Sequence, residues 1–507
     1  MAVDPRTPVI VGVGQFTERI DESGYRGMSA VDVATAAARS ALADSGASRA
    51  AETVDVVVGI RPFEISGPGT PPLGASSNYP RSVARRLGAQ PARAVLEPVG
   101  GQGPQKIVTE FAGAIARGEL DVALLFGSET GSTEKFFAGR ADKPDFTETV
   151  DGQLEDRGYG FETFIDEYAV RHGLLGAPAQ YGALENARRR RLGLDVAGYR
   201  RAMGELFAPF TKVAAKNPFS SSPVQRDVDE LVTITADNRM ICDPYPRLLV
   251  ARDQVNQGAA VLVMSVAAAR RLGVADEKWV YLHGHADAVE QPLLQRADLG
   301  ANPAAALAIR EALRVAGIGM DDLEVLDLYS CFPIAVFAVC DALGLSTGDP
   351  RGLTLTGGLP YFGGPGNNYS MHAIAEVVGE MRDKPGSFGL VGANGGILSK
   401  YSAGVYSALP AEWSPDRSAA LRDDVAALPT VPHVRAADGA ATIETYSVRY
   451  DWEARTGVIV GRLDSDDRRF LAVTTDDDLV ALMSDGDPLG APIVVRSDDR
   501  VNRASPA

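Results

Sequence analysis

Cysteine is scarce in this 507-residue chain, which contains only Cys242, Cys331 and Cys340. Three cysteines cannot make a disulfide framework for a protein of this length. None lies in a Cys-x-x-Cys pair or in a metal-ligand cluster. The sequence therefore predicts no metal site, no required cofactor and a reducing compartment, the cytoplasm.

Long hydrophobic runs and an excess of positive charge are also absent. No stretch reaches 18 uninterrupted apolar residues, and the amino terminus enters a strand pattern without the basic and apolar regions of a signal peptide. The chain has 50 basic and 66 acidic residues, so its net charge of -16 repels a phosphate backbone. We therefore expect neither a membrane nor a nucleic acid as partner.

The composition is otherwise that of an ordinary globular protein, with 45% hydrophobic and 23% charged residues. The length corresponds to about three structural units. Short β-branched runs at 8–13, 54–60, 121–126, 259–266 and 325–328 alternate with alanine-rich segments that have a helical pattern. This alternation predicts an α/β architecture with buried strands.

A weak internal repeat relates two parts of the sequence. In residues 38–60 and again in 309–331, a helical pattern ends in Ala-Leu and a glycine, and an acidic turn and an apolar strand follow. Residues 100–103 and 363–366 are both glycine-rich, and each precedes a helical pattern and a strand. The chain therefore contains one helix–strand design twice.

Composition also divides the chain into domains. Residues 1–270 form a first half with a charged, irregular insertion at 131–225, and residues 271–410 form a second half. A proline-punctuated linker at 411–435 leads to residues 436–507, where short strands alternate with Asp/Gly turns. We expect a small antiparallel β-barrel there.

The two glycine-rich turns each precede a helix N-terminus. Free backbone N–H groups and a partial positive charge at such a terminus suit an anion, a thiolate or an oxyanion. The alternative is that the glycines only permit tight turns and close helix packing.

The ordered set of motifs resembles the thiolase superfamily. The first half has PVIVGVGQ, then the segment from Gly101 to Glu129 that ends IARGELDVALLFGSE, then NPF and QGAA. The second half has YSCFP beginning at Tyr329, then TGGLPYFGGPG and GANGG. The resemblance spans about residues 5–410 and is closest to the sterol carrier protein 2 thiolases. The C-terminal extension resembles the additional domain of thiolase-like proteins of type 1.

This resemblance implies a duplicated five-layered α-β-α-β-α fold with an OB-like barrel behind it. It also implies coenzyme A or acyl-coenzyme A as ligand. Thiolases generally pair through the sheet edge of the first half, so the chain is expected to be a homodimer, or a monomer if its changed segments prevent pairing.

The residues that a thiolase needs are missing. A thiolase uses a nucleophilic cysteine at a helix N-terminus, where the helix dipole favours the thiolate. By resemblance this position is Gly101, and the family histidine, asparagine and second cysteine fall on Gly364, Ala335 and Ala393, with Asn394 adjacent. Loss of one member of a catalytic set can cost orders of magnitude in rate. We therefore predict no thiolase activity.

Three further side chains are candidates for the same pocket. Tyr329 stands where related enzymes carry histidine, and is either a satisfied structural phenol or a proton donor. Cys331 is expected to be an inert buried thiol. His372, about two turns into the helix after Gly364, is either packed in the core or a base near neutral pH.

A run of arginines, Arg188, Arg189, Arg190 and Arg191, lies in the insertion. Guanidinium groups suit the phosphates of coenzyme A, which this region covers in thiolases. The alternative is a solvated helix face on which Glu185 is the local ion-pair partner.

Three functions remain open from the sequence. The leading hypothesis is a thiolase-like binding or accessory protein of lipid or sterol metabolism that has lost its acyltransferase chemistry. A second is a retro-aldol lyase or acyltransferase that acts on acyl-coenzyme A through Tyr329. A third is an assembly scaffold.

Overall fold

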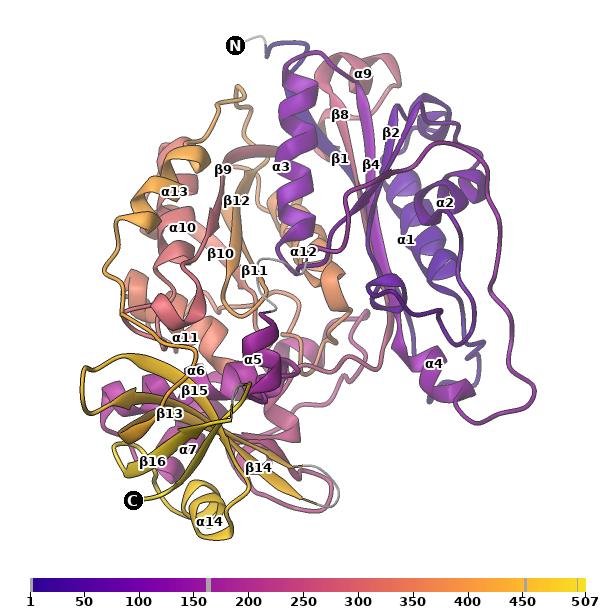
Figure 1. Cartoon of the computed structure of the whole chain (residues 1–507). Coiled ribbons are helices and arrows are strands. Elements are labelled where there is room, and N and C mark those ends of the chain that lie inside the picture. Colours follow the sequence, from indigo (N-terminus) through magenta and orange to yellow (C-terminus); the bar gives the residue numbers. More distant parts are fainter. Residues whose placement is uncertain (1–2, 161–165, 451–453, 499) are drawn as a thin grey trace.

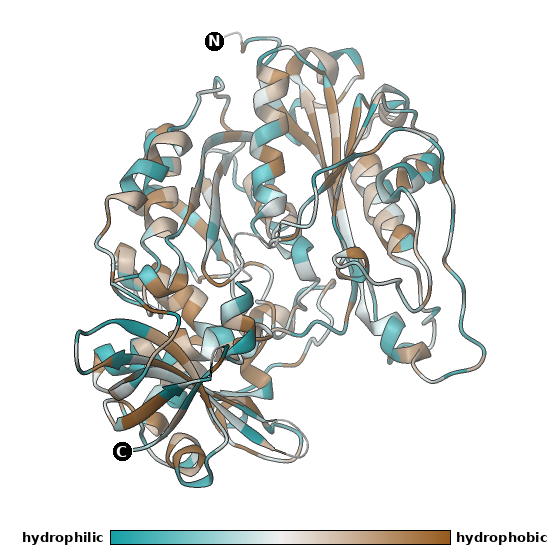
Figure 2. Cartoon of the chain, viewed as in Figure 1, coloured by the Kyte–Doolittle hydropathy of each residue, from teal (hydrophilic) through white to brown (hydrophobic). Residues whose placement is uncertain are grey.

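The computed structural model describes residues 3–160, 166–450, 454–498 and 500–507 (Figure 1). The first half contains a mixed sheet, and hydrophobic residues concentrate on its strands (Figure 2). Its order is β1 (Pro8–Glu18), β8 (Asn256–Ser265), β4 (Val122–Thr130), β2 (Val56–Ile60), β3 (Arg93–Glu97) and β5 (Glu155–Asp156).

The second half contains a smaller sheet with the same succession of strands. Its order is β10 (Leu323–Leu328), β11 (Phe388–Gly395), β12 (Lys400–Ser407) and β9 (Tyr281–Val289). In each half a parallel pair, β2–β4 or β10–β11, is followed by two antiparallel strands. The strands expected from the β-branched runs are all present.

The predicted repeat is confirmed at the level of single contacts. A Cβ at Gly12 on β1 would lie 2.1 Å from the carbonyl oxygen of Ala41, and one at Gly284 on β9 would lie 1.9 Å from that of Ala312. Ala41 and Ala312 are the aligned alanines of the repeat, on α1 (Ala30–Asp44) and α10 (Pro303–Ala316). Each half therefore packs one helix directly onto a strand backbone that only glycine permits.

The helices complete five layers, as the thiolase resemblance implies. Helices α3 (Gly103–Ala116) and α12 (Tyr369–Asp383) lie between the sheets and contact strands of both. Helix α1 covers the outer face of the first sheet, and α10 covers the second. The other helices of the two halves are α2 (Tyr79–Leu87), α9 (Val266–Arg271) and α11 (Pro333–Leu343).

The insertion at 131–225 differs from the irregular segment expected, because about half of it is helical. Its helices are α4 (Gly131–Phe137), α5 (Glu167–Arg171), α6 (Ala177–Leu192) and α7 (Val196–Ala214). Between it and β8 lie α8 (Val228–Val232), β6 (Met240–Cys242) and β7 (Tyr245–Pro246). The expected linker likewise contains a helix, α13 (Ser418–Ala426), which buries Leu421 and Val425 one turn apart. Charged residues interrupt the apolar pattern of α6, in the insertion, and of α13, in the linker.

The C-terminal region forms the predicted barrel. Strands β14, β15, β17, β16 and β13 follow one another, and β14 closes onto β13. All ladders are antiparallel except β15–β17. The elements are β13 (Gly439–Tyr450), β14 (Arg455–Leu463), β15 (Arg469–Thr474), α14 (Asp477–Asp485), β16 (Pro492–Ser497) and β17 (Asn502–Pro506).

The barrel is docked on the insertion (Figure 1). Strand β6 pairs with β13 through Cys242 and Arg449, and α6 lies against β13. Thr445 donates a hydrogen bond of 2.6 Å to the Ala183 carbonyl, and a Cβ at Gly182 would lie 2.3 Å from the Asp243 carbonyl oxygen. The two parts therefore share backbone contacts and form one body.

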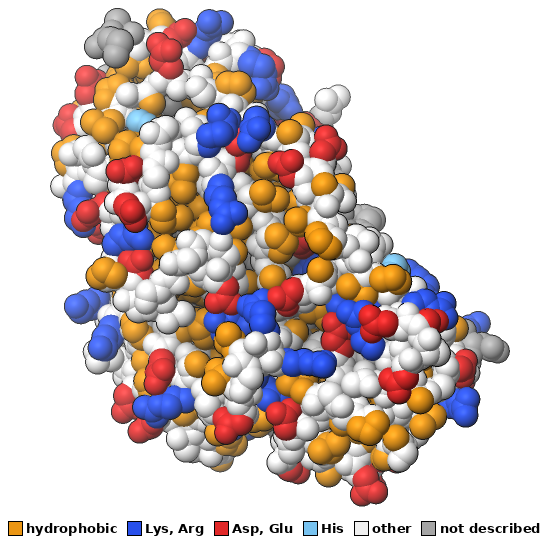
Figure 3. Space-filling model, turned by 90° about the vertical axis from the view of Figure 1, so that its left-hand side faces the viewer, with side chains coloured by type: hydrophobic (Ala, Val, Ile, Leu, Met, Phe, Trp, Pro, Cys, Tyr) orange, Lys and Arg blue, Asp and Glu red, His pale blue; other side chains and the backbone are white. Residues whose placement is uncertain are grey.

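Acidic and basic side chains are interspersed over the face drawn in Figure 3. Among the described helices, none is both long and apolar enough to cross a bilayer.

The close approach of α6 to the barrel predicts the effect of one methyl group. Gly182→Ala should lower the free energy of unfolding by about 1–3 kcal/mol, because the new Cβ overlaps the Asp243 carbonyl. Thermal and urea unfolding measure this change.

Gly379→Ala in α12 is the matched control, because a Cβ there meets no atom within 4 Å. It should stabilise the protein by about 0.5–1 kcal/mol. Equal stability of the two variants would contradict the packing described.

Candidate functional site

Gly101 lies in the turn before α3, against the ends of β10 and β11. A Cβ at this position would lie 2.4 Å from the Tyr329 hydroxyl oxygen and 2.5 Å from the Asn394 carbonyl oxygen, closer than the 3.0 Å that real Cβ atoms keep. The position that resemblance assigns to the nucleophile therefore lacks both a side chain and the space for one.

Tyr329 is buried at the end of β10. Its N–H donates to the Gly392 carbonyl at 3.0 Å, and its ring stands edge-on to Tyr369 with 5.3 Å between the centroids. Burial raises the pKa of the Tyr329 hydroxyl well above its ordinary value, and the nearby Cys331 and Glu129 act in the same direction. The phenol is therefore protonated at neutral pH and can serve as a hydrogen-bond donor.

Cys331 belongs to a buried group that includes Tyr181 and Asn394. The Asn394 side-chain amide donates to the Tyr181 hydroxyl at 2.9 Å, and this hydroxyl donates to the Gly396 carbonyl. Burial raises the pKa of the Cys331 thiol to about 12. Cys331 is thus a protonated thiol with little nucleophilic character.

Tyr181 was not identified from the sequence. It comes from α6, and its ring stacks on Phe332 with 4.5 Å between the centroids. Its place in a charged insertion, far along the chain from Asn394, gave no local signal of a central position.

Gly364, within the second glycine-rich turn, and His372, on the helix after it, have different hydrogen-bond partners. The Gly364 N–H donates to the Arg252 carbonyl at 2.7 Å. His372 is fully buried on α12, with its Nδ1 2.7 Å from the Gln15 side-chain oxygen on β1. It is Ser370 that contacts the first turn, through a hydrogen bond to the Gly101 carbonyl.

The environment of His372 is apolar, and burial lowers the pKa of its imidazole to about 3. Its ring lies edge-on to Phe362, and its Nε2 has no hydrogen-bond partner among the described residues. His372 is therefore a neutral core residue facing β1, where it does not contact Gly101.

The two remaining thiolase positions are also in the core. Ala335 lies in the first turn of α11, and Ala393 is a buried residue of β11. The side chain that reaches Gly101 from the end of β10 is Tyr329.

Several buried polar atoms around the two turns have no partner among the described residues. Gln102 Oε1 and Asn394 Oδ1 belong to the surroundings of Gly101, and Ser221 Oγ and Gln257 Oε1 lie close to Gly363. Buried polar atoms are rarely left unpaired, so each such atom calls for an explanation. Because these atoms lie at both turns, we call the residues around Gly101 and Gly363 the central polar site.

The arginine run is engaged within the chain. Arg188 forms two hydrogen bonds with Asp341, and Arg189 forms two of 2.9 Å with Asp487 on the barrel. Arg190 donates to backbone carbonyls of β13, and Arg191 pairs with Asp298 and Asp341. These guanidinium groups hold α6 to α11 and to the barrel.

Glu185 is not on a solvated face with the arginines. It is fully buried and accepts hydrogen bonds from the hydroxyls of Tyr199 and Tyr245 and from the Ile334 N–H at the start of α11. Burial raises the pKa of its carboxyl to about 7. Glu185 therefore anchors α6 to the helix that follows Cys331.

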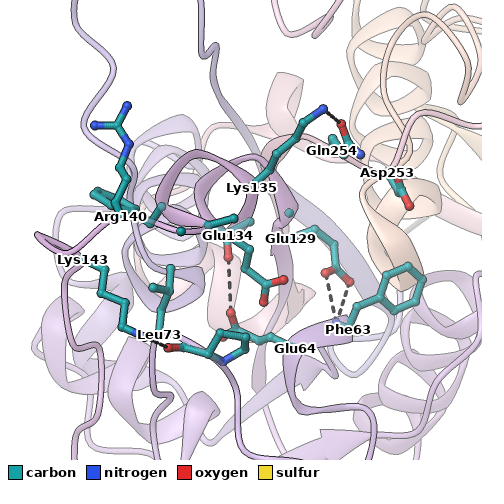
Figure 4. Close-up of a pocket in the computed structure, with 16 residues that line it drawn as sticks. Phe63, Glu64, Leu73, Glu129, Glu134, Lys135, Arg140, Lys143, Asp253 and Gln254 are labelled. Carbon is teal, nitrogen blue, oxygen red and sulfur yellow. Dashed lines mark hydrogen bonds between the residues drawn. The ribbon is translucent and has the colours of Figure 1, made fainter.

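A carboxylate-lined cavity of about 740 Å³ lies beside the central site. Glu64, Glu129 and Glu134 converge in it (Figure 4), and both oxygens of Glu129 accept the Phe63 N–H, at 3.0 and 3.1 Å. Burial raises the pKa of Glu64 to about 7 and that of Glu129 well above its ordinary value. Glu129 also lies against the second glycine-rich turn, since a Cβ at Gly366 would be only 2.2 Å from its Oε1. The cavity and the turn therefore share this carboxylate.

The neutral state of His372 predicts a pH dependence of stability. The unfolded chain takes up a proton at this residue below its ordinary pKa of 6.5, whereas the folded chain does so only near pH 3. Stability from this residue is therefore present above pH 6.5 and is lost as the pH falls. Between pH 7.5 and 5 the wild type should lose about 2 kcal/mol more than His372→Asn.

Urea unfolding of both proteins across this pH range measures the difference. Comparing them cancels the contribution of the other buried groups. Parallel stability curves for wild type and variant would show that His372 titrates normally.

A family model described as the thiolase-like protein type 1 additional C-terminal domain matches residues 420–500. No curated protein matches the chain. The crystal structure of a monomeric SCP2-thiolase like protein type 1 from Mycobacterium smegmatis has 59% identity, covers 100% of both chains and gives a TM-score of 0.86.

Two more distant structures show the fold alone. The acetyl-CoA acetyltransferase from Syntrophomonas wolfei has 16% identity over 79% of this chain and 99% of its own, with a TM-score of 0.55. The dimeric peroxisomal thiolase of Saccharomyces cerevisiae has 14% identity over 80% and 98%, with a TM-score of 0.57. With the first relative matched from end to end, the chain belongs to the SCP2-thiolase-like proteins of type 1.

Proposed function

We propose that this protein uses the thiolase fold to bind acyl thioesters of coenzyme A without thiolase chemistry, as a binding or accessory protein of lipid or sterol metabolism. The observation that carries the proposal is the contact between Gly101 and Tyr329. The hydroxyl of Tyr329 occupies the volume that a nucleophilic side chain at position 101 would need.

Acyl transfer through a thiolase mechanism needs a side-chain nucleophile and a base that activates it. Gly101 offers neither, and the Cys331 thiol is protonated at neutral pH because of its burial. His372, the histidine nearest in sequence to Gly364, is neutral and bonded to Gln15. No pair of these groups brings a nucleophile within reach of a base.

The groups that remain at the centre support binding of a carbonyl compound. Tyr329 supplies a protonated phenol that can donate to a thioester carbonyl oxygen. The turn also lies at the positive end of α3, where the helix dipole favours negative charge on that oxygen. The unpartnered side-chain oxygens of Gln102 and Asn394 accept hydrogen bonds from an amide or hydroxyl of the same ligand.

The same phenol favours one alternative, a lyase in which Tyr329 donates a proton to a carbonyl oxygen of a bound acyl-coenzyme A. Its protonated state and its position beside Gly101 support this reading. Turnover by the wild type that disappears in Tyr329→Phe would replace the binding function by this one.

Thiolysis and thioester binding by the pure protein can be measured separately. Pure protein should cleave acetoacetyl-coenzyme A at least ~10³-fold more slowly than a thiolase assayed beside it, since the catalytic set is missing. Calorimetry should nevertheless show saturable binding of acetyl-coenzyme A. Tyr329→Phe, which removes one hydrogen bond at nearly constant volume, should weaken binding about 5- to 10-fold.

Gly101→Cys separates missing chemistry from missing space. Because the new Cβ would meet Tyr329 and Asn394, this variant should be less stable than the wild type and should gain no thiolysis. Thiolysis by the wild type, or its restoration by this single cysteine, would refute the proposal that the thiolase chemistry is absent. An absence of any affinity for coenzyme A thioesters would refute the proposed ligand.

We also propose that the chain is a monomer in solution. The outer edge of β3 is covered by β5, which pairs with it through Val95 and Leu96. Arg157, directly after β5, holds this cover in place with hydrogen bonds of 2.7–2.9 Å to Glu97 and Glu110. An edge strand that is already paired cannot continue into a partner's sheet.

Light scattering after size-exclusion chromatography should therefore give the mass of one chain, 53.5 kDa, at every concentration tested. A mass near twice this value at micromolar concentration would show that another surface pairs the chains.

A further inference from the structure

A second cleft, of about 700 Å³, lies where the barrel meets the two halves. It is bounded by α5, by the loop that follows β9, by the turn between β11 and β12, and by the chain that enters the barrel. The barrel contributes Leu471, and the segment before it contributes His433 and Arg435. The additional domain and the segment before it therefore form one wall of the cleft.

Arg296 is the buried cation of this cleft, with only 3% of its surface exposed. Its Nε donates to the Gln291 carbonyl at 2.9 Å, its Nη1 to the Ile397 carbonyl at 3.0 Å, and its Nη2 to Ser399 Oγ at 3.3 Å. All three partners are neutral. Within the described part of the chain, no carboxylate forms an ion pair with Arg296.

Burial of this unpaired charge is unfavourable, and it lowers the pKa of Arg296 to about 10. The guanidinium is still charged at neutral pH. Three hydrogen bonds leave two of its five N–H groups for another acceptor.

The acidic residues of the cleft have other partners. Asp166 pairs with Arg435 at 2.9 Å, and Glu167 pairs with Arg171. Glu290 accepts the Gln291 and Ala304 N–H groups, at 2.8 and 2.9 Å, and so caps the start of α10. Glu290 is near enough to stabilise the charge of Arg296, but it forms no hydrogen bond or ion pair with the guanidinium among the described residues.

Aliphatic side chains form part of the wall of the cleft. They include Leu293, Leu294, Ile397 and Leu471. The volume lies within the range of about 300–1,000 Å³ typical of small-molecule sites. A buried guanidinium with spare donors beside aliphatic side chains suits a ligand that has an anionic head and an apolar body.

We propose that this cleft binds an amphipathic organic anion, with a carboxylate or phosphate head against Arg296 and an aliphatic body against Leu293, Leu294 and Leu471. A guanidinium holds either head through paired N–H···O bonds. The cleft is lined by other residues than those around Gly101, although Tyr181 of the central polar site also acts on the charge of Arg296. Its existence does not depend on the function proposed there.

The test is calorimetry of the full chain with decanoate, decyl phosphate and decanol, each below its micellar concentration. At least one anion should bind with a stoichiometry of one and at least 10-fold more tightly than the neutral alcohol. The anion that binds more tightly identifies the head group. Equal affinity for decanol would show that Arg296 does not select the ligand.

Two variants test the site independently. Arg296→Gln removes the charge, and Leu293→Trp fills the cleft without changing the hydrogen bonds of Arg296; each should weaken anion binding at least 10-fold. Arg49→Gln, at an exposed ion pair with Glu52, is the matched control and should bind as the wild type does. If Arg296→Gln does not fold, Leu293→Trp decides.

The proposal is overturned if neither anion saturates the wild type, or if a folded Leu293→Trp binds as tightly as the wild type. Leu293→Trp should retain the affinity of the wild type for acetyl-coenzyme A. The anion titrations therefore test this cleft, and the acetyl-coenzyme A titration tests the site at Gly101.

Discussion

The contact of Tyr329 and the Asn394 carbonyl with the α-carbon of Gly101 determines what the centre of this molecule can do. Both oxygens lie within 2.5 Å of the point where a Cβ would stand. The two halves therefore meet around a residue without a side chain, and the chemistry left at that point consists of hydrogen-bond donors and acceptors. A site of this kind can hold and orient a carbonyl group, whereas covalent attack needs an atom that the packing leaves no room for.

The additional barrel is tied to the rest of the fold through the insertion. The arginines of α6 form ion pairs and hydrogen bonds with α11, the barrel and the second half. Glu185, on the buried face of the same helix, accepts a hydrogen bond from the start of α11. Tyr181, on the same helix, hydrogen-bonds to Gly396 and Asn394 at the central site. Helix α6 thus contacts the barrel and also contributes Tyr181 to the central polar site.

Much of the architecture could be predicted because its signals are local. The strand runs and the aligned alanines predicted the α/β architecture and the repeat, and the change in composition near residue 436 predicted the barrel. The five layers followed from the resemblance of the motifs to thiolases. The partners of the arginines could not be predicted, because 298 residues separate Arg189 from Asp487 in the sequence. Helix α6 was missed because its buried face includes charged and polar residues, whose partners only the folded chain provides. Helix α7 has an apolar buried face but contains Gly204 and Pro209, which disfavour a helix. The space around Gly101 is likewise a tertiary property, and no motif reports it.

The glycine at position 101 also bears on how such a protein could change over time. A substitution that supplied sulfur there would first have to displace a buried tyrosine ring and a strand-end carbonyl, and would still find no histidine at the second turn. A cysteine placed there would therefore lower stability before it could supply any chemistry. Close packing thus favours the retention of glycine at this position, whatever the neighbouring residues bind.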